Sequence, residues 1–115
     1  MDKNVWLVCE ARAKIIKALS HPARIFIVEE LQKGERCVNE LQDMIGFDMS
    51  TVSKHLSILK NAGIVDGRRD GTTTYYYLRV PCILNFFGCI LEVMKSNEKR
   101  SNELFKSVEL HLKRG

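Results

Sequence analysis

Two short helical segments joined by a tight turn, with a hairpin directly after them, are the feature that most constrains the fold. The first segment runs from about Val38 to Ile45 and stops at Gly46, a residue suited to the left-handed end of a helix. The second follows Asp48, a good N-cap, and continues to about Ala62. This pattern predicts a helix-turn-helix.

The residues after this motif predict a two-stranded hairpin. A β-prone run begins at Ile64, and a second run with alternating side chains extends from Thr72 to Val80. Asp70-Gly71 lies between them, and Asp-Gly in this position is a strong signal for a tight hairpin turn. A helix-turn-helix followed directly by such a hairpin is a winged helix-turn-helix.

Amphipathic helices flank the motif on both sides. We expect a first helix from about Asn4 to Leu19, a second from Pro22 to near Gly34, and a last one that begins at Pro81. This last helix gives way to a polar segment from Lys95 to Glu103, and a final amphipathic turn or two follows from Leu104 to Leu112.

The predicted fold class is mainly α with a small β-hairpin wing, in the order ααααββα. One winged helix-turn-helix domain is expected over residues 1–112. Its first and last helices offer more apolar surface than one small domain can cover, which predicts a homodimer. The apolar residues concerned are Val8, Ile15, Phe86, Ile90 and Met94.

Composition limits the classes of function. The 115 residues carry a formal net charge of +4, which permits a polyanionic partner without requiring one. No uncharged apolar run of about 18 residues is present, so we expect a cytoplasmic protein with no membrane partner. No Ser/His/Asp grouping, glycine-rich phosphate loop or paired-acid motif is visible, which argues against an enzyme.

The face of the second helix opposite Val52, Leu56 and Leu59 carries short hydroxyls and lysines. Hydroxyls near a helix N-terminus suit base edges and phosphates in the major groove, and lysines neutralise backbone charge. We therefore predict contacts with double-stranded operator DNA from this face and from the wing. The candidate residues are Ser50, Thr51, Ser53, Lys54, His55, Ser57, Lys60, Arg68, Arg69 and Thr72. A winged helix that binds protein instead of DNA is the alternative.

Three strings resemble those of a known family. They are Ala-Leu-Ser-His-Pro-Ala-Arg at residues 18–24, Glu-Arg-Cys-Val-Asn-Glu-Leu at 35–41 and Ser-Thr-Val-Ser-Lys-His-Leu-Ser-Ile-Leu-Lys at 50–60. They look like the ArsR/SmtB family of arsenical-resistance and metal-sensing repressors, and the resemblance covers about residues 5 to 92. It implies a homodimeric repressor, joined through its first and last helices, that leaves DNA when an effector binds. His55 matches the histidine of the family's recognition helix.

The resemblance also shows which of the family's metal sites this chain lacks. The family's arsenite sensors often carry Cys-Val-Cys on the third helix, whereas this chain has Cys37-Val38-Asn39. An amide is a poor substitute for a thiolate around a soft metalloid. The Asp-x-His motif of the family's zinc and nickel sensors is also missing, because His21, His55 and His111 are scattered.

Cys82 and Cys89 are seven residues apart on one stripe of the last helix, where some arsenite-sensing relatives carry cysteines. Four cysteines in a cytoplasmic chain are expected to be reduced thiols. We therefore expect no obligatory cofactor but a thiophilic effector, arsenite first and a persulfide or other oxidant second. Cys37 is the candidate third thiolate.

Two alternatives for the cysteines stay open. In the first alternative, Cys82 and Cys89 pack as two small buried residues in the dimer interface. Cys9 with Cys37 would instead resemble the family's cadmium and lead sensors. Geometry also sets a condition: two fully helical residues seven apart have Cα atoms roughly 10 Å apart, too far for one metalloid or a disulfide to bridge. Cys82 must therefore be non-helical, or another cysteine must complete the site.

Overall fold

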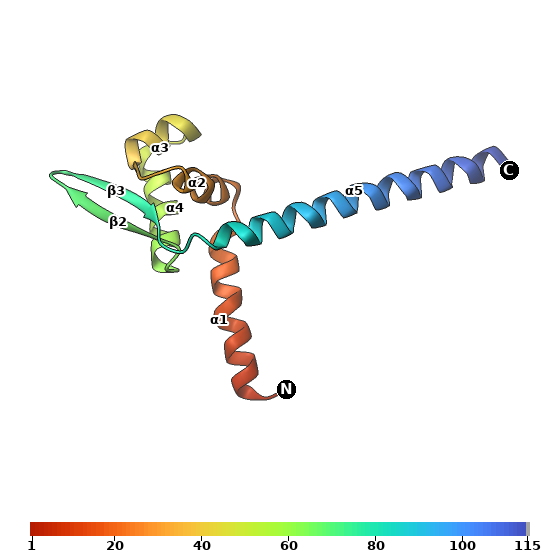
Figure 1. The fold of residues 1–115 in the computed structure, drawn as a ribbon, viewed down its shortest axis with the longest axis horizontal. Helices are drawn as coiled ribbons and strands as arrows, with labels where there is room; N and C mark the ends of the chain where they lie inside the picture. Colours follow the sequence, from red (N-terminus) through yellow and green to blue (C-terminus); the bar gives the residue numbers. More distant parts are fainter. Residues whose placement is uncertain (115) are drawn as a thin grey trace. The chain divides into compact units, whose positions relative to one another are not determined.

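The computed structural model describes residues 1–114, which form five helices and three strands (Figure 1). The helices are α1 (Lys3–Leu19), α2 (Pro22–Gln32), α3 (Val38–Ile45), α4 (Met49–Asn61) and α5 (Ile83–Arg114). The strands are β1 (Arg36–Cys37), β2 (Val65–Asp70) and β3 (Thr73–Leu78). This order confirms the mainly helical winged arrangement, with β1 as an element that the sequence did not predict.

The chain divides into two compact units, one from Met1 to Pro81 and one from Cys82 onward. The first unit holds the helix-turn-helix and the sheet, and the second begins with Cys82 and contains α5. The expectation of one domain over residues 1–112 stays a prediction.

The core of the first unit is built from the apolar stripes of α2, α3 and α4 and from the start of β2. Each stripe follows the helical period, so every helix contributes residues three, four or seven positions apart to the same interior. Its largest fully buried side chains are Ile27, Val28, Leu41, Val52, Leu56, Leu59 and Val65. Since three of these belong to α4, the opposite face of α4 is directed away from the core.

Local signals fix where the helices begin and end. At the start of α2, the His21 ring accepts a hydrogen bond from the Ala23 N–H (Nδ1 to N, 3.0 Å), and Pro22 occupies the first helical position. α3 ends at Gly46, whose φ of 83° is left-handed as expected. α4 begins after Asp48, whose carboxylate accepts from the Thr51 N–H at 2.7 Å.

The three strands form one antiparallel sheet in the order β1-β3-β2. The β2–β3 hairpin extends beyond α2–α4 as the wing (Figure 1). Its register pairs Asp70 with Thr73, so the two turn residues are Gly71 and Thr72, one position later than the Asp-Gly signal suggested. Only the first of them has a positive φ, 63°, which fits a type II′ turn with glycine in its first central position.

The last helix differs from the sequence prediction in two ways. Pro81 lies in a turn together with Cys82, and α5 begins only at Ile83. α5 then continues without interruption to Arg114, through the segment 95–103 that was expected to break it. Despite its 32 residues, neither α5 nor any other helix within residues 1–114 has the apolar stretch needed to cross a membrane.

Candidate nucleic-acid interface

The exposed face of α4 contains most of the residues that the sequence predicted to contact DNA. Four of the predicted side chains are exposed and two are half-buried at the edges of the face. The exposed ones are Ser50, Lys54, Ser57 and Lys60, and the half-buried ones are Thr51 and Ser53. Lys60 faces Asp66 at 3.9 Å, a loose and exposed pair, whereas Lys54 forms no ion pair within residues 1–114. The face is therefore polar and positively charged.

The start of α4 is held firmly in place. The Asp48 carboxylate accepts the Thr51 N–H. Hydrogen bonding to the Thr51 side chain first, and to its backbone second, lowers the pKa of Asp48 below its usual value. The carboxylate thus stays ionised at neutral pH and caps the positive end of the helix. Because the first turn is fixed, the hydroxyls of Ser50 and Thr51 project from a rigid scaffold.

His55 does not belong to this face, which corrects its inclusion among the DNA contacts. Its side chain is only 9% exposed and packs on the His21 ring, with the ring centroids 4.4 Å apart. The Arg24 guanidinium lies within hydrogen-bond distance of it (Nη1 to Nδ1, 3.3 Å). Burial, followed by the nearby His21 and Arg24, lowers the pKa of His55. His55 therefore joins α4 to α2 as a neutral, structural side chain.

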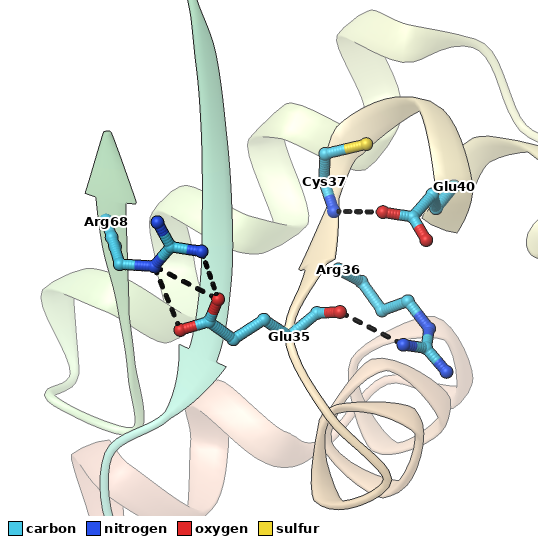
Figure 2. A network of polar contacts seen from close by, with 5 residues as sticks. All are labelled: Glu35, Arg36, Cys37, Glu40 and Arg68. Carbon is cyan, nitrogen blue, oxygen red and sulfur yellow. Dashed lines mark hydrogen bonds and ion pairs between the residues drawn. The ribbon is translucent and has the colours of Figure 1, made fainter. Parts of the chain in front are cut away.

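The wing residues differ in how free they are. Arg69 and Thr72 are exposed at the hairpin end, and Arg69 Nε donates to the Gly71 carbonyl at 3.3 Å. Arg68 is instead held by Glu35 in a two-pronged ion pair (Figure 2): Nη2 donates to Oε2 at 2.7 Å and Nε contacts both oxygens at 3.1 and 3.2 Å. Its guanidinium also lies 5.2 Å from the Tyr75 ring centroid. Arg68 is therefore held in an ion pair in the structure, and its contact with DNA stays a prediction.

Glu35 is a residue that the sequence reasoning missed. It precedes β1, 33 positions before Arg68, and only the pairing of β1 with β3 and of β3 with β2 brings the two side chains together. Figure 2 shows the same segment continuing into α3, where the Cys37 N–H donates to the Glu40 carboxylate at 3.1 Å. This bond is the main reason why the pKa of Glu40 is lowered.

The four cysteines are all free thiols and lie in different elements. Cys37 is half-buried at the N-cap of α3 and pairs with Tyr75 in the sheet. Cys9 in α1, Cys82 in the turn before α5 and Cys89 in α5 are exposed. Among residues 1–114, no group of three or more His, Cys, Asp or Glu side chains is arranged to hold a metal ion.

Comparison with known proteins gives the family of this helix-turn-helix. The model of the bacterial regulatory proteins of the arsR family matches residues 21–66, which include α2, α3 and α4. The HTH-type transcriptional regulator Rv0081 of Mycobacterium tuberculosis is 37% identical over 84 residues, which cover 72% of this chain and 74% of that protein. The chain belongs to the ArsR family.

One further sequence match and one solved structure agree with this assignment. The HTH-type transcriptional repressor SmtB of Mycobacterium tuberculosis is 42% identical over 71 residues, 62% of this chain, and the match spans about half (53%) of SmtB itself. The crystal structure of Rv0081 superimposes with a TM-score of 0.72 at 33% identity, covering 81% of this chain and 94% of that one.

A similar solution structure, from Mycobacterium bovis, is that of a homodimer. It is described as a homodimeric winged helix-turn-helix DNA-binding domain, Mb0332, and it matches with a TM-score of 0.73 at 27% identity. The match covers 87% of this chain and 93% of that domain. The winged helix-turn-helix fold predicted from the ArsR-like sequence is thereby confirmed.

Proposed function

We propose that this chain is a homodimeric transcriptional repressor that binds operator DNA through α4 and the wing. The observation that carries the proposal is the polar, basic face of α4, held rigid by the Asp48 cap and by three fully buried apolar residues on the opposite side. Arg69 at the hairpin end supplies a further exposed cation. The repressor SmtB is a relative of this chain, which supports the same role.

Dimerisation is supported by the apolar side chains that α1 and α5 leave exposed in the single chain. Trp6 in α1 is 54% exposed and Met94 in α5 is 59% exposed, and each helix carries further exposed large apolar side chains. Large exposed apolar patches commonly mark protein–protein interfaces. Two recognition helices in one dimer would then enter successive major grooves, about 34–36 Å apart. Sedimentation that finds a stable monomer at micromolar concentration would contradict this arrangement.

The DNA-binding test compares substitutions of proposed phosphate-contacting residues with a substitution of a proposed base-contacting residue. Lys54→Ala and Arg69→Ala each remove a proposed phosphate contact, so each lowers affinity for every duplex and flattens the salt slope by about one unit. Ser50→Ala instead changes the preference among operator variants, because its hydroxyl is placed to reach base edges.

The matched control is Lys33→Ala, which removes the same charge from the end of α2, where Lys33 is paired with Glu30 at 2.9 Å. It should leave the slope unchanged. Equal effects of all four substitutions on sequence preference would contradict the division of roles.

For the effector, we propose a thiophilic species, with arsenite first, that binds Cys82 and Cys89 with Cys37 as a third thiolate. The non-helical position of Cys82 supports this site, because it removes the fixed separation of roughly 10 Å that a continuous helix would impose. Homodimer formation offers a second source of thiolates. No cofactor is required for folding in this proposal.

The test of the effector measures operator release by arsenite, by a polysulfide and by cadmium or lead. Wild type is compared with single serine variants of the four cysteines and with Cys82→Ser/Cys89→Ser. Loss of the arsenite response in the double variant supports the proposed site. Release by a polysulfide alone favours a persulfide-responsive repressor, and a response to cadmium or lead that depends on Cys9 and Cys37 favours the cation site. Undiminished release of the double variant by arsenite would remove the proposal.

A further inference from the structure

A basic hollow lies between the C-terminal half of α1 and the end of α4. It has a volume of about 390 Å³ and is lined by Lys14 and Lys17 of α1, by Arg24 of α2, and by Ile58 and Asn61 of α4, with Ala18 of α1 and Ala62, which directly follows α4. All of these residues belong to the first compact unit. Three cations and one amide thus converge on one depression beside the recognition helix.

In the part of the chain that the structure describes, no acidic side chain pairs with the positive charge in this hollow. Arg24 faces His55 rather than a carboxylate, and its buried Nε has no hydrogen-bond partner in the described chain. An uncompensated group of cations around a concave surface attracts an anion, and fixed donors at its wall hold it.

The position of Asn61 connects the hollow with the face of α4. Asn61 follows Ser50 by 11 residues, which is about three helical turns, so both lie on one stripe together with Lys54. α4 has 13 residues and is therefore about 20 Å long, whereas the major groove is about 12 Å wide. When the first turn of α4 reads base edges, its last turn lies at the edge of the groove, where the phosphates are.

We propose that this hollow binds a phosphate group of the DNA backbone at the edge of the major groove. The inference rests on the proposed function and extends the interface from α4 and the wing to α1. Lys14 and Lys17 supply the charge, and the Asn61 amide donates a hydrogen bond that fixes the phosphate. The contact adds affinity and sets the depth of α4 in the groove, and it carries no sequence preference of its own.

The test compares Lys14→Gln/Lys17→Gln with Lys3→Gln/Lys33→Gln in DNA-binding titrations between 0.05 and 0.3 M salt. Both double variants change the net charge by the same amount at exposed helix or cap positions, and neither control lysine lines the hollow. The first pair should flatten the salt slope by about 0.9 for the one lost phosphate contact, which is about fivefold in affinity over the sixfold range of salt that is titrated. The control pair should leave the slope near that of wild type.

Asn61→Asp places a negative charge at the same wall and should weaken binding to all duplexes equally. Circular dichroism and sedimentation establish that each variant is folded and assembled as wild type is. If wild type binds DNA and the Lys14/Lys17 variant binds it with the same slope, this inference fails while the proposed function stands. Binding of inorganic phosphate that depends on Lys14 and Lys17, with DNA affinity unchanged, overturns it in favour of a small anion. Absence of DNA binding by wild type fails the proposed function itself.

Discussion

Glu35→Gln should strengthen DNA binding, because it releases Arg68 from the only carboxylate that holds it in the described chain. In the structure the Arg68 guanidinium donates to both oxygens of Glu35, at 2.7 to 3.2 Å. These bonds lower the pKa of Glu35, so the carboxylate is ionised across the neutral range and the pair is close to electrically neutral. Glutamine has nearly the same shape but no charge, so it frees the cation at the base of the wing.

The size of the effect follows from one released charge. The side chains of Arg68 and Glu35 are 50% and 37% exposed, so water already weakens their attraction and the guanidinium can turn toward a phosphate. One added phosphate contact steepens the dependence of log affinity on log salt by about 0.9. Between 1 M and 0.1 M salt this amounts to about an eightfold gain in affinity relative to wild type.

Fluorescence anisotropy with a labelled duplex measures the slopes of wild type, Glu35→Gln and Glu35→Gln/Arg68→Gln. The double variant should return the slope to the wild-type value, because the cation that causes the gain is removed. Glu30→Gln is the control, since it breaks another ion pair of a glutamate, with Lys33, and should not change the slope. An effect of Glu35→Gln equal to that of Glu30→Gln would refute the reasoning. A weaker affinity for Glu35→Gln would also refute it and would indicate that the ion pair holds the wing in its DNA-binding position.

Two further predictions concern stability. Leu56→Ala leaves a cavity under α4 because Leu56 is fully buried, and it should lower the free energy of unfolding by about 3–5 kcal/mol. Ile58→Ala, on a residue that is 41% exposed, should cost less than about 1.5 kcal/mol in the same denaturant titration, and equal losses would contradict the packing. The lowered pKa of His55 means that the unfolded chain takes up its proton first, so stability is lost as pH falls below about 6.5, the unfolded pKa. In His55→Gln the side chain faces the same His21 and Arg24 but cannot titrate. The unfolding midpoints of this variant at pH 7.5 and pH 5 should therefore differ less than those of wild type. An equal difference in both proteins would contradict the role of His55 in the pH dependence.

The helices of the first unit could be predicted because their signals are local. Asp48, Gly46 and Pro22 lie at the ends that they mark, and the apolar period needs only a window of one helix. The two-residue strand β1 could not be predicted, since its partners Tyr75 and Tyr76 are 38 and 40 positions away. The break expected at 95–103 was wrong because polar residues without glycine or proline can continue an exposed helix.

The site was predictable to the same extent. Helical periodicity separates the exposed residues of α4 from its buried ones, and the same periodicity explains the error at His55: it follows Val52 by three positions and precedes Leu59 by four, which places it on the buried stripe. The pairing of Arg68 with Glu35 has no local signal, because it depends on the sheet. The hollow at Lys14 and Lys17 likewise requires the packing of α1 beside α4.

The positions of the cysteines separate two physical routes from an effector to DNA. Cys37 is directly linked to the DNA-binding elements: its N–H caps α3 through Glu40, and it pairs with Tyr75, whose ring lies next to Arg68. A group bound to its sulfur therefore acts on the first helix of the helix-turn-helix and on the wing of the same subunit. Cys82 and Cys89 lie in the second unit, with the helix proposed for dimerisation, so a ligand there acts on the spacing of two recognition helices. Either route needs a coupling free energy of only about 1–3 kcal/mol to release an operator. The spacing of the two recognition helices affects binding only when both half-sites of the operator are bound. A duplex that contains one half-site should therefore respond to an effector that acts by the first route and not to one that acts by the second.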